Sequence, residues 1–101
     1  MPLTSQQIKR LRAEGHRLRL KPVVIVGQKG FSDNLQREID AALIHHELIK
    51  LRIPALERAE RKQLGQQICE QHQATLVESI GNVIVLYRLN PETNRYGKLL
   101  T

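Results

Sequence analysis

Residues 21–43 read KPVVIVGQKGFSDNLQREIDAAL, and this stretch decides the fold. The β-branched run 23–26 has no polar alternation and lies between a proline and a glycine, which is typical of an interior strand. Ser32 and Asp33 are candidate helix caps, and apolar residues then recur at helical spacing up to Leu43. The pattern predicts a strand, a glycine loop and a helix that follow one another without a gap.

Before this stretch, the sequence predicts a first helix with a basic exposed side. Thr4 is a good N-cap, Gln7 completes a capping box, and Leu3 with Ile8 forms a hydrophobic staple. Because glycine weakens a helix, we expect the regular helix to end near Gly15.

After it, the segment 48–53 places Ile49, Leu51 and Ile53 on one face and Lys50 with Arg52 on the other, as a half-buried strand requires. Residues 57–72 are rich in helix formers. Two strand-like runs, 75–80 and 83–89, flank Gly81-Asn82, a pair suited to a two-residue hairpin turn. The polar segment from about residue 90 is expected to be a loose tail.

These elements predict one compact α/β domain over residues 1–101, in the order α-β-α-β-α-β-β. The expected architecture is a four-stranded mixed sheet packed with three helices, with a right-handed βαβ crossover. A chain of 101 residues is the usual size of one domain.

Composition excludes several classes of protein. Cys69 is the only cysteine, so no internal disulfide can form, and the N-terminus lacks the apolar run of a secretory signal. The longest apolar runs are far shorter than the roughly 20 residues that span a bilayer. We therefore expect a cytoplasmic protein with no membrane association.

The charge is concentrated at one end of the chain. The net charge is +6, and residues 1–30 hold seven basic side chains against one acid, whereas the other residues hold nine of each. Such a run can be only a solvated face, or it can attract a polyanionic partner such as nucleic acid or an anionic membrane surface. The candidate contact residues outside the loop are Lys9, Arg12, Arg17, Arg19 and Lys21.

The loop formed by Gly27, Gln28, Lys29 and Gly30 lies where a strand precedes a helix. Its backbone N–H groups and the helix N-terminus can face an anion together, although a G-x-x-G turn also occurs without any ligand. The spacing of nucleotide-triphosphate and dinucleotide loops is missing. The G-x-x-G clamp of RNA-binding KH domains is the nearer physical analogue.

Aromatic side chains make up only 3% of the chain. Phe31 and Tyr87 occupy positions that are typical of a core, so stacking of bases on an aromatic platform is not expected. This pattern favours binding through phosphates and shape, which depends strongly on salt.

A catalytic or metal site is not predicted. His45, His46 and Glu47 are adjacent, and neighbouring helical residues point about 100° apart without the H-E-x-x-H spacing of a zinc site. The alternative is that the helix ends here with a histidine near its last carbonyls. Cys69 is typical of a small buried residue. We expect no cofactor, no small-molecule substrate and no enzymatic activity.

Several blocks together resemble one family. The blocks are Leu20-Lys21-Pro22-Val23-Val24, Val26-Gly27-x-x-Gly30, Glu38-Ile39-x-x-Ala42-Leu43, His46-Glu47-Leu48-Ile49-Lys50, Ile80-Gly81 and Val85-Leu86-Tyr87-Arg88. The chain resembles the CRM domain, in particular the stand-alone bacterial YhbY family, from Leu3 to about Arg88.

The resemblance implies a fold similar to the C-terminal domain of a bacterial translation initiation factor. It also implies binding to rRNA in precursor large ribosomal subunits and a role in ribosome assembly. By position, the family's RNA-contacting loop corresponds to residues 27–30, and its basic surface to residues 9–21. Gly15 replaces an alanine usual in the family, which leaves open whether Arg17 or Arg19 faces the RNA.

Two alternatives to RNA binding remain at this point. The basic segment could dock an acidic protein partner without direct RNA contact, or the chain could be a small enzyme that uses His45, His46 or Glu47. Dependence on RNA separates the first alternative from RNA binding, and turnover separates the second.

Overall fold

The computed structural model describes residues 3–27 and 32–101. The elements are α1 (Ser5–Leu18), β1 (Pro22–Ile25), α2 (Asp33–His46), β2 (Leu48–Arg52), α3 (Arg58–His72), β3 (Thr75–Ile80), β4 (Val83–Tyr87) and α4 (Gly97–Leu100). The predicted order of three long helices and four strands is confirmed, and the short helix α4 is added to it.

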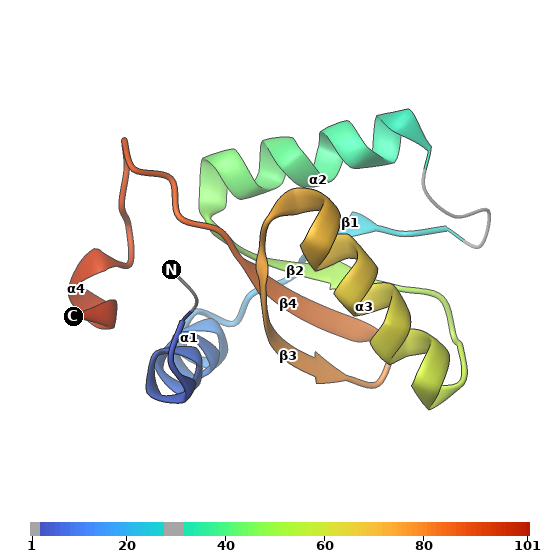
Figure 1. The fold of residues 1–101 in the computed structure, drawn as a ribbon, viewed down its shortest axis with the longest axis horizontal. Helices are drawn as coiled ribbons and strands as arrows, with labels where there is room; N and C mark the ends of the chain where they lie inside the picture. Colours follow the sequence, from blue (N-terminus) through green and yellow to red (C-terminus); the bar gives the residue numbers. More distant parts are fainter. Residues whose placement is uncertain (1–2, 28–31) are drawn as a thin grey trace.

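The four strands form one mixed sheet in the order β1-β2-β4-β3. Strand β1 pairs with β2 in parallel, and the other two pairings are antiparallel. Helices α2 and α3 lie on one face of this sheet, whereas α1 and α4 lie on the other side (Figure 1). The expected compact α/β architecture is therefore confirmed.

The sheet separates two cores. The core on the α2–α3 face contains Ile39, Leu43 and Ile68 from the helices, packed on the inward side chains of all the strands except β3, whose Leu76 lies at its margin. The core on the other face centres on Leu11 of α1, which is fully buried against β2, β3 and β4. No residue of β1 belongs to this second core.

Strand β1 is an edge strand, so the expectation of an interior strand is wrong. Val24 and Val26 are buried, but Val23 is 50% exposed and Ile25 is 67% exposed. An unbroken aliphatic run predicts a strand that is covered on both faces, and here only one face is covered. The sequence of the run does not show this difference, because it depends on where α1 packs.

Helix α1 begins as predicted and continues past the predicted end. The capping box between Thr4 and Gln7 is present. The helix extends to Leu18, and Arg19 then ends it in the left-handed conformation with φ of 53°. Gly15 is buried within it, because packing against the sheet outweighs the roughly 1 kcal/mol that glycine costs in a helix.

The segment 90–101 is not the loose tail that its polar sequence suggests. Tyr96, Leu99 and Leu100 pack against the core under α1. The side chain of Gln7 donates a hydrogen bond to the carbonyl of Leu100 at 2.8 Å. The three apolar residues complete a core that α1 leaves partly open, and the buried Glu47 accepts hydrogen bonds from the start of the segment.

Candidate functional site

Gly27 directly follows the paired part of β1. The N–H of Val26 still donates to the carbonyl of Arg52 at 2.8 Å, and Gly27 beyond it is exposed. Its φ does not lie in the left-handed region, and a Cβ atom built on it would meet no atom of the described residues within 4 Å. Packing against the described residues therefore does not require glycine here, and the exposed backbone is open to close approach by a ligand.

The other three loop residues that the sequence singles out are Gln28, Lys29 and Gly30. They lie outside the described residues, and so does Phe31. Their assignment to ligand binding stays a prediction.

The N-terminus of α2 is partly satisfied by its own side chains. The hydroxyl of Ser32 accepts a hydrogen bond from the N–H of Leu35 at 3.1 Å, and the exposed Asp33 adds a negative charge to the first turn. An anion at this helix end would compete with both groups. The exposed backbone at Gly27 is thus a better candidate for a phosphate contact than the helix end.

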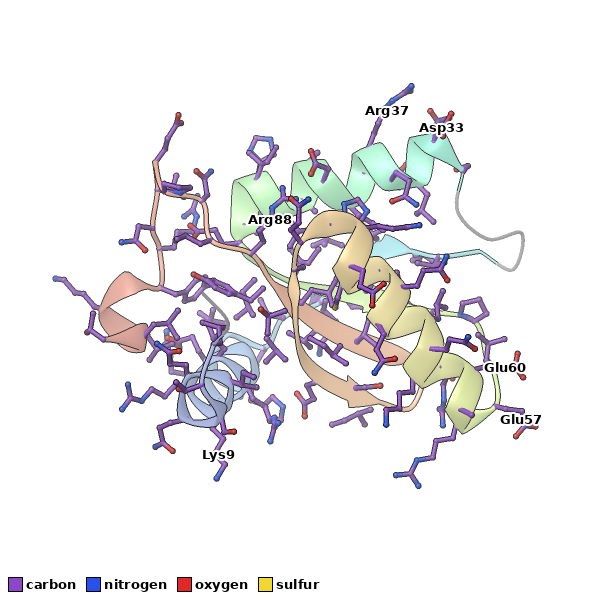
Figure 2. The ribbon with its side chains drawn as sticks, in the orientation of Figure 1. Lys9, Asp33, Arg37, Glu57, Glu60 and Arg88 are labelled. Carbon is purple, nitrogen blue, oxygen red and sulfur yellow. The ribbon has the colours of Figure 1, made fainter. Side chains whose placement is uncertain are left out.

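The five predicted basic residues are all exposed, but they differ in what they contact. Lys9 projects away from the domain on α1 (Figure 2). A guanidinium nitrogen of Arg12 lies 3.5 Å from the carbonyl oxygen of Val77. Arg17 pairs with Glu14, whose hydrogen bond and charge raise the pKa of Arg17 above its ordinary value. Part of the basic surface of α1 is therefore engaged within the protein.

The predicted residues do not form a single cluster. Arg19 and Lys21 precede β1, and Gly27 follows it. An extended strand rises about 3.3 Å per residue, so Lys21 and Gly27 lie about 20 Å apart. Figure 1 places α1 near the start of β1 and away from its end. The outward side of β1 connects the two regions.

Two further cations lie beside this strand. Lys50 pairs in register with Pro22, and the exposed Arg52 pairs with Ile25. The sequence identified both only as the polar face of a half-buried strand. The predicted βαβ unit could have placed these two cations near Gly27, because two parallel strands that a helix connects end at the same edge of the sheet.

Glu47 has a structural role. Its side chain is fully buried, and its oxygens accept hydrogen bonds from the Thr93 hydroxyl at 2.6 Å and from the N–H groups of Arg95 and Asn90 at 3.0 and 3.3 Å. Burial raises the pKa of this carboxyl, but the hydrogen bonds outweigh it, and the pKa lies below its ordinary value. The carboxylate is therefore not accessible to act as a base on an external substrate.

The other candidate residues for catalysis or metal binding are His45, His46 and Cys69. Helix α2 ends at His46 as the sequence suggests, and both His45 and His46 are exposed with ring centres 6.4 Å apart. Burial raises the pKa of the Cys69 thiol to about 11, so the nucleophilic thiolate is scarce at neutral pH. Over residues 3–27 and 32–101, no three histidine, cysteine or acidic side chains lie close enough to hold a metal ion.

Arg88, part of the last family block, also has a structural role. Its guanidinium donates to the carboxylate of Asp40 at 2.8 Å and to the carbonyl of His72 at 3.1 Å. Arg88 thus connects the end of β4 to α2 and α3, on the face of the sheet that these two helices cover (Figure 2).

Within the part of the chain that the structure describes, no helix is long and apolar enough to cross a bilayer.

The comparison with protein families matches residues 3–88 to the CRS1 / YhbY (CRM) domain. The chain belongs to the CRM-domain family. This is a family of RNA-binding domains and not a known family of enzymes. The resemblance of the sequence blocks is thereby confirmed over the same residues.

Individual relatives agree with this assignment. This CRM domain is 40% identical over 95 residues to a probable RNA-binding protein of Pseudomonas aeruginosa, covering 94% of this chain and 89% of that protein. It is 34% identical over 90 residues to an RNA-binding protein of Haemophilus influenzae, covering 89% of both. It is also 32% identical over 93 residues to the probable RNA-binding protein YqeI of Bacillus subtilis, covering 92% of this chain and 95% of YqeI.

A solved structure has the same fold. The solution structure of a Staphylococcus aureus protein, itself a candidate RNA-binding protein, matches with a TM-score of 0.76 and 31% identity. The match covers 88% of this chain and 91% of that protein. The four-stranded sheet with its helices on both faces is therefore a fold that this CRM domain shares with it.

Proposed function

We propose that this CRM domain is a non-catalytic, cytoplasmic RNA-binding factor that assists assembly of the large ribosomal subunit. The observation that carries the proposal is the exposed Gly27, whose side-chain position no described atom approaches within 4 Å and which has Arg52 beside the same strand end. A phosphate can approach such a backbone closely, and the cations supply long-range attraction.

Two further facts support RNA as the partner, and a third counts against the enzymatic alternative. The relatives are named as RNA-binding or probable RNA-binding proteins. The excess positive charge lies in the N-terminal part of the sequence. Glu47, the acid of the enzymatic alternative, is buried and saturated with hydrogen bonds. The ribosomal destination rests on the resemblance to the single-domain bacterial form.

Sedimentation of a cell extract tests the proposal. The tagged protein is run through a sucrose gradient with and without RNase, at two salt concentrations. We expect it to migrate with precursors of the large subunit, to be released by RNase, and to be released by high salt. An RNase-resistant complex with protein would support the interaction-module alternative and contradict RNA binding.

Substitution of the loop glycines tests the predicted phosphate contact. Gly27→Val is expected to leave the fold intact, because nothing in the described structure occupies the space of its side chain. Affinity for RNA is expected to fall, and to fall further when Gly30 is also replaced by a bulkier residue. Unfolding by urea controls for stability, and unchanged affinity in the folded double variant would overturn the assignment of the loop.

A further inference from the structure

A groove of about 680 Å³ opens beside the start of β1, away from Gly27. The start of β1, the neighbouring part of β2, the C-terminal end of α2 and the segment before α4 contribute its walls. The side chains that matter for its chemistry are Lys21, His45, His46, Lys50, Arg95 and Tyr96. Lys21 is one of the contact residues predicted from the sequence, whereas the groove itself was not predicted.

The groove has cationic walls. Lys21, Lys50 and Arg95 line the groove, and no acidic side chain does. The nearest acid along the chain is Glu47, whose carboxylate is fully buried beneath the segment 90–95 and engaged by hydrogen bonds. It lies 3.9 Å from the Nε of Arg95 and offsets part of that charge, so Lys21 and Lys50 are the cations of the groove without this pairing. The groove therefore favours an anionic occupant.

The groove also offers apolar and aromatic surface. Val23 lines it and is half exposed. The ring of Tyr96 is held by an edge-on contact with Tyr87, at 6.1 Å between ring centres and an angle of 82°. Tyr87 itself is buried, whereas Tyr96 is partly exposed. A nucleobase or ribose can pack on such surfaces only where it is not covered in a duplex.

The surface continues from the groove to Gly27 along β1. Ile25 is 67% exposed and follows Val23 on the same side of the strand. Arg52 is beside Ile25, two residues after Lys50 on β2. An aliphatic row on β1, Val23 and Ile25, thus lies beside a cationic row on β2, Lys50 and Arg52, and each row spans about 7 Å.

We propose that the groove and the outward side of β1 form one track for single-stranded RNA, with phosphates on Lys21, Lys50, Arg52 and Arg95 and bases or riboses on Tyr96, Val23 and Ile25. This inference rests on the proposed function, RNA binding. It explains how the separate regions at Gly27 and at the start of β1 contact one ligand. A duplex would use the cations but would leave the exposed aliphatic side chains without a role.

The first test compares two pairs of charge-neutralising substitutions. Lys21→Gln with Lys50→Gln removes two cations from the track, whereas Lys62→Gln with Lys98→Gln removes two exposed cations that do not line the groove. The probe is a fluorescent 20-nucleotide single-stranded RNA of random sequence, with a 20-base-pair RNA duplex as comparison. Affinity is measured over a series of salt concentrations.

For the first pair we expect a loss of affinity of roughly tenfold per lost contact. The slope of log affinity against log salt should flatten by about 0.7 for each contact. The control pair should change both quantities much less. Equal losses in the two pairs would overturn the track, because the cations would then act only through net charge.

The second test compares two exposed isoleucines on opposite edges of the same sheet. Ile25→Thr on β1 is expected to weaken binding of the single strand severalfold without changing the salt slope, since it removes apolar contact but no charge. Ile80→Thr on β3 is the matched control, as Ile80 is 62% exposed and also β-branched. Equal effects of the two substitutions would overturn the path along β1.

The duplex separates the remaining outcomes. Stronger loss with the single strand than with the duplex supports the track, and equal loss with both overturns its selectivity for single strands. Failure of the unmodified protein to bind either RNA at low salt would overturn the proposed function and the track together. Binding by the unmodified protein with no effect of any track substitution would overturn only the track.

Discussion

The two faces of the sheet differ in how completely helices cover the side chains of β1. On the α2–α3 face, Val24 of β1 and Val26 just after the strand are each only 4% exposed. On the opposite face, Val23 and Ile25 of the same strand are 50% and 67% exposed. Because α1 packs over β3, β4 and the start of β2, the aliphatic surface of β1 stays open to a ligand.

The closed face should respond most strongly to a loss of side-chain volume. Ile39→Ala removes a fully buried side chain of α2 and is expected to lower the free energy of unfolding by about 2–5 kcal/mol. Ile44→Ala on the same helix removes a side chain that is 47% exposed, and its effect should be much smaller. Urea unfolding measures both, and similar losses would contradict the distinction between the two sides of α2.

Glu47 connects the closed core to the segment that completes the other face, and its substitution should have an intermediate effect. Glu47→Gln replaces an ionised acceptor that three groups of the segment 90–95 contact, and is expected to cost about 1–3 kcal/mol at neutral pH. Urea unfolding again measures the loss. Thr93→Val removes one of the same hydrogen bonds and serves as a partial control.

The effect of Glu47→Gln should also depend on pH. The pKa of Glu47 in the folded protein lies below its ordinary value of 4.5, so ionisation favours the folded state. This stabilisation is complete above the ordinary pKa and is lost as the pH falls through the lowered pKa. The difference in stability between the protein and the variant should therefore shrink at acidic pH, and a difference that grows on acidification would contradict this role.

The smallest effect on stability is expected for an exposed pair of side chains between α1 and β3. His16 and Glu78 pair across α1 and β3 at 2.8 Å, but the His16 side chain is 63% exposed. An exposed pair of this kind contributes about 0–1 kcal/mol. His16→Gln should therefore leave the free energy of unfolding nearly unchanged. A loss as large as that of Ile39→Ala would mean that this pair contributes far more than an exposed pair is expected to.

Local patterns in the sequence predicted those elements whose formation depends on neighbouring residues. The capping box of Thr4 and Gln7 starts α1, and Gly81 adopts φ of +55° in the turn between β3 and β4. Alternation along β2 correctly placed Ile49, Leu51 and Ile53 in the core. In each case the deciding contacts or periodicities span only a few residues.

The errors lie where distant segments meet. The end of α1 depends on how Gly15 packs on the sheet, and the ordering of the segment 90–101 depends on a core that residues of α1 provide. For the candidate site, the sequence identified Gly27 and the basic residues of the N-terminal part. It did not identify Lys50, Arg52 or Arg95 as neighbours of that surface, because their positions follow from strand pairing and from the path of the C-terminal segment.

By itself, the sequence determined the order of the elements, the concentration of positive charge and the membership of the CRM family, since these depend on residue types and their spacing. Only the tertiary structure decided that β1 lies at the edge of the sheet with its outward side uncovered. The physical reason is that burial depends on which surfaces pack together. Aliphatic residues of one segment form a core where helices cover them and stay exposed where none does.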